Sequence, residues 1–220
     1  MHKIVENLIN IQNLIKSKQS LLEDCKKIPK IIAVSKTFEL NQILPLIEYG
    51  HKDYGENKVQ EAIEKWSDIK SKNSKIKLHL IGKLQTNKVK ISLRIFDFIH
   101  SLDNEKLARK IFDEQQKQNL RPKLFIQINI GDESQKNGIN INKLSEFYNY
   151  CKKLNLNVVG IMCIPPINED PKKVFSIMNN LKNKLKLEEL SMGMSSDYLD
   201  AIKHNSTFLR IGSSIFGPRT

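Results

Sequence analysis

The stretch Ile31-Ile-Ala-Val-Ser-Lys-Thr37 decides the fold, because it is a short apolar run that ends abruptly in a lysine. Branched and small apolar residues in such a run predict a strand that is buried on both faces. The first polar side chains after a strand of this kind emerge at its carboxyl end, where parallel α/β sheets bind their ligands. Neighbouring loops shelter a lysine there, which lowers the pKa of an ammonium group and favours Schiff-base formation with an aldehyde. Lys36 is therefore the main candidate for a residue that forms a Schiff base with an aldehyde ligand. The alternative is that Lys36 only ends the strand and extends into water.

The same alternation of strand and helix recurs along the whole chain. Residues 4–22 carry apolar side chains at helical spacing, which predicts a helix before the first strand. Eight strand candidates follow, each with a helical segment after it, and they begin at residues 31, 51, 77, 96, 123, 158, 189 and 208. This order predicts right-handed crossovers between parallel strands.

Eight repeats in 220 residues favour a closed (β/α)8 TIM barrel with an extra N-terminal helix, folded as a single domain over residues 1–220. The alternative is an open, doubly wound sheet. No glycine-rich dinucleotide motif follows the first strand, because Val34-Ser-Lys-Thr37 occupies that position.

Charge, cysteine and hydropathy patterns weigh against several classes of function. The net charge of +12 is spread over segments that also carry acidic residues, and aromatic residues that could stack on bases are not interleaved with it. A nucleic-acid-binding module is therefore a weaker hypothesis than a cofactor-binding regulatory protein or an enzyme. No apolar stretch is long enough to span a membrane and no signal peptide is evident, so we expect a cytoplasmic protein. Cys25, Cys151 and Cys163 lie far apart, which predicts unpaired thiols, and the scattered histidines predict no metal site.

Polar residues at the carboxyl ends of the expected strands should converge on one mouth of the barrel. They are Lys36, Asn57, His79, His100, Asn129, Ser191 and Arg210. Two loops there have the composition of a phosphate site, Ser191-Met-Gly-Met-Ser-Ser-Asp197 and Arg210-Ile-Gly-Ser-Ser-Ile-Phe-Gly217. A lysine that forms a Schiff base, together with a phosphate site, describes a pocket for pyridoxal 5'-phosphate. Arg210 would donate a hydrogen bond to an unprotonated ring nitrogen, the alternative being a surface ion pair.

Several motifs, in the right order over nearly the whole chain, resemble the pyridoxal phosphate homeostasis protein family. They are Val34-Ser-Lys-Thr37, Tyr54-Gly-Glu-Asn-Lys-Val-Gln-Glu61, His79-Leu-Ile-Gly82 with Leu84-Gln-Thr-Asn-Lys88, His100-Ser-Leu-Asp103, Gly160-Ile-Met162 with Ile164-Pro-Pro166, Ser191-Met-Gly-Met-Ser195 and Arg210-Ile-Gly212 with Ile215-Phe-Gly217. One departure is Ser213-Ser214, where the family usually has Thr-Ala; the hydroxyl is kept.

The resemblance implies a fold-type III barrel, similar to the N-terminal domain of alanine racemase, that holds pyridoxal phosphate as a lysine aldimine. It assigns the aldimine to Lys36, phosphate contacts to the loops of residues 191–195 and 212–213, and the ring-nitrogen contact to Arg210. With the strand-end residues, the predicted cofactor contacts are Lys36, Asn57, His79, Ser191, Met192, Gly193, Ser195, Arg210, Gly212 and Ser213. The expected function is that of a carrier or regulator of the vitamin B6 pool, without a catalytic residue. Pyridoxal-phosphate-dependent apo-enzymes are its candidate partners, and a monomer is the expected state.

A pyridoxal-phosphate-dependent amino-acid racemase is the alternative function. In alanine racemase the second acid/base group comes from an additional C-terminal domain, whereas here only a few residues follow the eighth expected strand. We therefore expect no racemase turnover.

Overall fold

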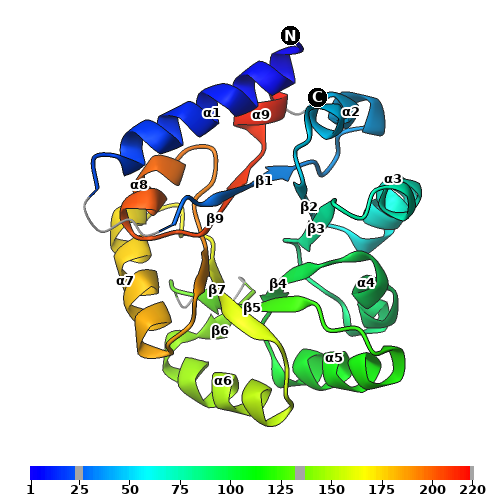
Figure 1. The fold of residues 1–220 in the computed structure, drawn as a ribbon. Coiled ribbons are helices and arrows are strands. Elements are labelled where there is room, and N and C mark those ends of the chain that lie inside the picture. The colour runs from blue at the N-terminus through cyan, green and yellow to red at the C-terminus, as the bar shows by residue number, and fades with distance from the viewer. Residues whose placement is uncertain (23–26, 132–136, 219–220) are drawn as a thin grey trace.

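Eight parallel strands close into a barrel surrounded by helices (Figure 1), in a computed structural model that describes residues 1–22, 27–131 and 137–218. Around the ring the strands follow the order β4-β3-β2-β1-β9-β8-β7-β5, and pairing of β4 with β5 closes it. Their bounds are β1 (Lys30–Val34), β2 (Asp53–Glu56), β3 (Lys77–Leu80), β4 (Phe98–Leu102), β5 (Lys123–Asn129), β7 (Val158–Cys163), β8 (Glu189–Ser191) and β9 (Phe208–Ile211). The predicted TIM barrel is confirmed.

The helices lie outside the barrel, one after nearly every strand (Figure 1). They are α1 (Lys3–Gln19), α2 (Leu40–Tyr49), α3 (Val59–Lys72), α4 (Val89–Ile95), α5 (Glu105–Gln118), α6 (Leu144–Lys153), α7 (Pro171–Lys184), α8 (Tyr198–Lys203) and the short α9 (Ser213–Phe216). Helix α1 precedes the barrel and packs on α8 and α9 through the buried residues Val5, Leu8, Ile11 and Ile15. This is the extra N-terminal helix that the apolar spacing predicts.

Two apolar layers hold the barrel together. The larger one lies between the strands and the helices, and it includes the fully buried Trp66 and Phe175. The smaller one fills the inside of the barrel and consists of Ile32, Phe98, Phe125, Met162 and Phe208. A filled interior means that ligands can bind only at the ends of the barrel.

Two strands differ from the sequence-based expectation by a shift of about two residues. Strand β2 runs from Asp53 to Glu56 rather than over residues 51–54, and β4 begins at Phe98 rather than at residue 96. Asp97 directly precedes β4, and its Oδ2 accepts the backbone N–H of Leu78 in β3 at 2.9 Å, so this residue pairs with β3 through its side chain. A short strand that the sequence did not indicate, β6 (Ile139–Asn140), pairs with β5 outside the ring.

The described cysteines, Cys151 and Cys163, are buried free thiols, and burial raises the pKa of each to about 12. Cys25 lies outside the described residues. Within the described ranges no group of three metal-binding side chains gathers. No helix there is both long and apolar enough to cross a membrane.

Candidate functional site

The turn that carries Lys36 is pinned on both sides of that residue. Before it, the backbone N–H of Ser35 donates to the Gly55 carbonyl at 3.0 Å, which continues the pairing of β1 with β2. After it, Thr37 has a φ of 69°, a left-handed conformation that is costly for a β-branched residue. The backbone N–H of Thr37 donates to Glu61 Oε1 at 2.6 Å. Lys36 therefore leaves the end of β1 from a backbone held by two neighbouring segments.

A buried ionic cluster from α3 supports this turn. Lys65 Nζ lies 3.1 Å from Glu56 Oε1 and 2.9 Å from Glu61 Oε1, and it donates to the Ser35 carbonyl at 2.9 Å. Glu56 Oε1 also accepts the indole N–H of Trp66 at 2.9 Å. Burial raises the pKa of Glu56 against the opposing effect of Lys65. The Ser35 hydroxyl donates to the same Glu56 oxygen at 2.8 Å, so three groups converge on it and hold the end of β1 against α3.

A cavity of about 490 Å³ opens beside Lys36 at the carboxyl ends of the strands. Six residues predicted from the sequence line it: Lys36, Asn57, Ser195, Arg210, Gly212 and Ser213. The other lining residues are Val34, Ile81, Gly82, Lys83, Gln127, Asn137, Ile164, Met194 and Ser196. The described lining contains no carboxylate, so the cavity carries positive charge and suits an anion.

Gly82 allows two sides of this cavity to meet. A Cβ atom on Gly82 would lie 2.3 Å from the carbonyl oxygen of Asn57, a distance that real side chains do not reach. Only glycine therefore permits the segment after β3 to pack against the segment after β2. The close approach sets the position of Asn57 at the cavity wall.

The two glycine- and serine-containing loops are joined by one hydroxyl group. Ser195 Oγ accepts the backbone N–H groups of Gly212 and Ser214, each at 3.3 Å. Gly193, with a φ of 89°, accepts the backbone N–H of Arg210 at 2.9 Å through its carbonyl. The loop after β8 and the loop after β9 thus form one surface, rich in hydroxyl and N–H groups, beside the end of β1 that carries Lys36.

Arg210 lies at the base of this surface and is only 5% exposed. Its guanidinium donates to Ser191 Oγ at 2.8 Å and to the Cys163 carbonyl at 2.7 Å. Burial lowers the pKa of Arg210, but an arginine begins so far above neutrality that it stays charged. With these two fixed bonds, the guanidinium has a single orientation from which its remaining N–H groups can address the cavity.

A chain of hydrogen bonds runs from Arg210 through the inside of the barrel, and we name it the relay. Ser191 Oγ lies 3.0 Å from His100 Nδ1, and His100 Nε2 lies 3.0 Å from His79 Nδ1. His79 Nε2 lies 3.0 Å from Asp53 Oδ1, at the start of β2. The relay therefore links the cavity to the opposite end of the barrel.

The donors and acceptors in the relay can be assigned, and every bond is donated in the direction from Arg210 toward Asp53. Burial lowers the pKa of His79, and burial together with His79 and Arg210 lowers the pKa of His100 well below its ordinary value, so both rings are neutral. The Asp53 carboxylate only accepts, so His79 carries its proton on Nε2 and accepts on Nδ1. His100 must then donate from Nε2 and accept the Ser191 hydroxyl on Nδ1. The rings stack on Phe98 and Phe125, each at 4.2 Å between centroids.

Four of the predicted contact residues do not line the cavity. His79 and Ser191 belong to the relay, and both ring nitrogens of His79 are engaged by protein atoms. His79 is thus connected to the cavity through His100, Ser191 and Arg210 and does not line it. Met192 is fully buried in the outer apolar layer, and Gly193 lies behind the Ser195 surface, where its carbonyl holds Arg210.

Sequence reasoning missed other lining residues, including Gln127 and Met194. An alternation signal was available for Gln127, because Phe125 lies inside the barrel and inward-facing residues of a strand recur at every second position. Met194 lies within the loop after β8 that the sequence predicts as part of a phosphate site, although the sequence does not single it out among the contact residues.

Comparisons with known proteins agree with one another along the chain. The sequence profile of the family "Alanine racemase, N-terminal domain" matches residues 9–220. The pyridoxal phosphate homeostasis protein of Aquifex aeolicus is 38% identical, with 90% of this chain and 89% of that protein covered. The protein of the same name from Pasteurella multocida is 36% identical, with 98% of this chain and 97% of that protein covered.

Among solved structures, PipY of Synechococcus elongatus with PLP bound superposes with a TM-score of 0.81 at 30% identity, covering 94% of this chain and 100% of that chain. Alanine racemase of Clostridium difficile superposes with a TM-score of 0.73 at 14% identity, covering 97% of this chain and 56% of that chain. The second likeness shows a shared fold alone.

Proposed function

Because the chain belongs to the alanine racemase N-terminal domain family and, within it, to the pyridoxal phosphate homeostasis proteins, we propose that it binds pyridoxal 5'-phosphate and acts in vitamin B6 homeostasis as a carrier or regulator. One observation carries this proposal: Lys36, Arg210 and the joined serine and glycine loops line a single cavity. A relative that shares nearly the whole fold was solved with PLP bound.

The residues of the cavity fit this cofactor in size and charge. A volume of about 490 Å³ lies within the range of small-molecule sites, and the described lining has no carboxylate to repel a phosphate. Lys36 would supply the amine that bonds to the aldehyde carbon, with release of water. Ser195, Gly212 and Ser213 would hold the phosphate, and Arg210 would face the ring nitrogen.

Arg210 also limits the chemistry that the site can support. The cofactor, when bound, supplies an electron-withdrawing ring that stabilises negative charge on an attached carbon. A guanidinium keeps its proton, so it leaves the ring nitrogen unprotonated and the ring a weaker electron acceptor. The relay fixes the guanidinium of Arg210 through Ser191, on the side away from the cavity.

We propose further that the protein has no racemase turnover. Racemisation needs an acid/base group on each face of the reacting carbon. The described lining contains no histidine, tyrosine, cysteine or carboxylate, and Lys83 is the only amine there besides Lys36. Capture and release of the cofactor is the activity that this set of residues supports, with apo-enzymes as the proposed recipients in the cytoplasm and a monomer as the proposed state.

Absorbance titration tests the binding proposal. Pyridoxal phosphate added to the purified protein should produce the visible band of a lysine Schiff base, saturating at one equivalent. Lys36→Ala should abolish the band, whereas the matched control Lys83→Ala should keep it. An unchanged band in Lys36→Ala would place the cofactor elsewhere.

Exchange of α-deuterium tests the proposal that the protein is not a racemase. The loaded protein, incubated with each common L-amino acid, should show no sustained exchange and no loss of optical purity. Turnover that disappears in Lys36→Ala would identify a racemase-like enzyme instead, and turnover that disappears in Lys83→Ala would identify its second acid/base group.

A further inference from the structure

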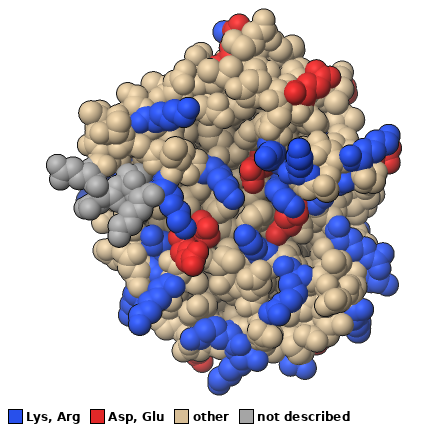
Figure 2. All heavy atoms as spheres, in the orientation of Figure 1, with Lys and Arg blue, Asp and Glu red and all other residues tan. Residues whose placement is uncertain are grey.

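A second concave surface lies at the other end of the barrel, where the strands begin. Lys30, Lys77 and Lys123 are the first residues of β1, β3 and β5, and Lys52 directly precedes β2. Because the strands are parallel, these residues meet at one end. Figure 2 views the molecule from this end and shows Lys and Arg side chains gathered around its centre, with few acidic side chains among them.

These lysines border a hollow of about 830 Å³, which we name the basic groove. Eight basic side chains line it: Lys30, Lys52, Lys70, Lys75, Lys77, Lys123, Arg94 and Arg121. Two acidic side chains, Asp53 and Asp97, complete its charged lining and leave a formal charge of +6. Half of the net charge of +12 that the sequence carries is thus concentrated in one groove.

Both carboxylates of the groove are already occupied by protein groups. Asp97 contacts Lys70 at 2.5 Å and Lys77 at 3.2 Å, and these bonds hold its pKa below the ordinary value against the effect of burial. Asp53 accepts the relay bond from His79, which likewise lowers its pKa. The charge of Lys30 also lowers the pKa of Asp53, but two carboxylates cannot balance eight basic side chains.

Two of the lysines lie over aromatic rings. Lys30 Nζ is 5.5 Å from the centroid of Phe208, and Lys123 Nζ is 5.4 Å from that of Phe98. Such contacts orient an ammonium group without removing its charge. The floor of the groove thus presents oriented positive charge over an apolar base.

We propose that the basic groove binds a small anion that carries two or more phosphate groups. A concave surface with apolar walls concentrates the field of its charges, and Leu93, Phe96 and Leu120 supply such walls here. Arginine and lysine together bind phosphate through forked and point-charge contacts. The aromatic residues of the lining, Phe96 and Phe98, are buried, so the groove offers no exposed ring on which bases could stack, which favours a compact anion over single-stranded nucleic acid.

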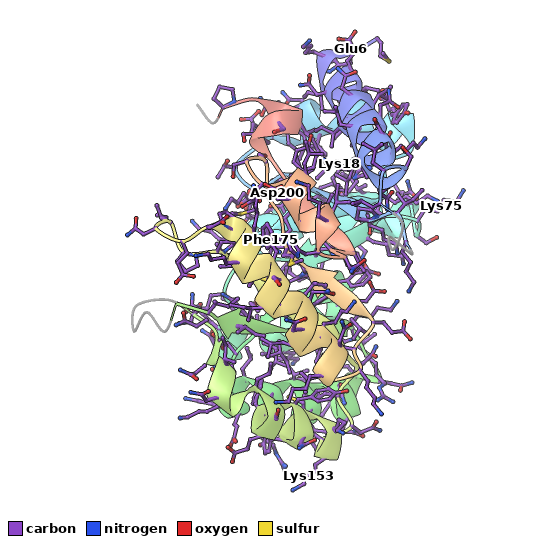
Figure 3. The ribbon with its side chains drawn as sticks, turned by 90° about the vertical axis from the view of Figure 1, so that its left-hand side faces the viewer. Glu6, Lys18, Lys75, Lys153, Phe175 and Asp200 are labelled. Carbon is purple, nitrogen blue, oxygen red and sulfur yellow. The ribbon has the colours of Figure 1, made fainter. Side chains whose placement is uncertain are left out.

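The groove is separate from the cofactor cavity. The two surfaces share no lining residue and lie at opposite ends of the barrel. In the side view of Figure 3, Lys75, which lines the groove, lies on the side of the molecule opposite the loop between β7 and α7. The proposed anion site is therefore a site in addition to the one for pyridoxal phosphate.

Calorimetric titration with inorganic tripolyphosphate tests this proposal on protein already saturated with pyridoxal phosphate, so that the mouth is filled. One equivalent should bind, and more weakly as salt is raised. The exposed pair Lys52→Gln/Lys75→Gln should raise the Kd at least about tenfold. The matched pair Lys153→Gln/Lys173→Gln removes the same charge from α6 and α7, outside the groove, and should change the Kd less than about twofold.

A second variant and two competing anions complete the test. Lys30→Gln/Lys123→Gln should weaken binding in the same way, with thermal unfolding recorded to show that the barrel is intact. A nucleoside triphosphate that binds at least as tightly supports the proposal, and the groove variants should weaken it too. Equal losses in the matched pair, binding only to the unloaded protein, or affinity that grows with the length of a single-stranded oligonucleotide would each overturn it.

Discussion

The two ends of the barrel present positive charge in different ways. At the mouth, Lys36 and Arg210 stand among hydroxyl groups, glycines and backbone N–H groups, and neighbouring segments hold the backbone next to Lys36 and the guanidinium of Arg210. At the basic groove, eight cations surround a wider hollow, and several are long side chains at its rim. The mouth is therefore built to orient one particular ligand, whereas the groove is built to attract negative charge of less defined shape.

The relay connects these two ends through the inside of the barrel. Its bonds all point from Arg210 toward Asp53, so the charge at the groove floor supports the orientation of a guanidinium at the mouth. Three substitutions test this difference between an ordered end and an attracting end. They follow from the largest expected effect to the smallest.

The ordered end depends most on Gly193. Its φ of 89° and a Cβ that would lie 2.6 Å from Ala201 Cβ combine backbone strain with overpacking. Gly193→Ala should therefore lower the free energy of unfolding by about 4 kcal/mol. Gly50→Ala is the matched control: its φ is 95°, but a Cβ there would meet nothing within 4 Å, so about 1 kcal/mol is expected. Urea denaturation measures both, and equal losses would show that packing at the mouth loops is not tight.

The relay depends on Ser191, whose hydroxyl serves two buried partners. Ser191→Ala leaves a guanidinium N–H of Arg210 and Nδ1 of His100 without their bonds, which should cost about 3 kcal/mol. It should also weaken pyridoxal phosphate binding, because Arg210 loses its fixed orientation. Ser101→Ala is the matched control, since Ser101 Oγ is buried without a hydrogen-bond partner among the described residues, and it should be nearly neutral. Unchanged cofactor affinity in a folded Ser191→Ala protein would contradict the positioning role.

At the attracting end Asp97 holds two of the groove lysines, and the loss of stability on its removal should vary with pH. The pKa of Asp97 is lower in the folded protein than in the unfolded chain, so its stabilisation is present above the unfolded pKa and is lost as pH falls through the folded one. Asp97→Asn should cost about 2 kcal/mol at pH 7 and progressively less in acid. Denaturation curves at several pH values measure this, and a loss that does not change with pH would exclude the ionic explanation. The same change adds one positive charge to the groove and should tighten tripolyphosphate binding.

Local pattern was enough to predict much of this structure. The strands beginning at Lys123, Glu189 and Phe208 have the predicted bounds, and each lies between segments whose sequence is clearly loop or helix. Lys36 and Arg210 were found because each marks the carboxyl end of such a run. The prediction that these ends converge required only parallel strands.

What the sequence hid depends on partners far apart in the chain. Glu56 is a carboxylate inside a strand, and its burial makes sense only beside Trp66 and Lys65 of α3. His79 was placed at the mouth because it is polar and near a strand end, but its bonds to Asp53 and His100 come from neighbouring strands and direct it inward. A pattern within one stretch of sequence cannot predict a hydrogen bond between side chains of different strands.

Trapping of the cofactor by borohydride, followed by mapping of the labelled peptide, tests the central claim most directly, because lysines stand at both ends of the barrel. The positively charged groove offers more amines and a wider opening than the mouth. If geometry rather than charge selects the cofactor, one equivalent of reduced pyridoxal phosphate should lie on Lys36, and the peptides that contain Lys30, Lys52 and Lys123 should remain unlabelled. Stoichiometric label on the groove lysines, with Lys36 unmodified, would contradict the account.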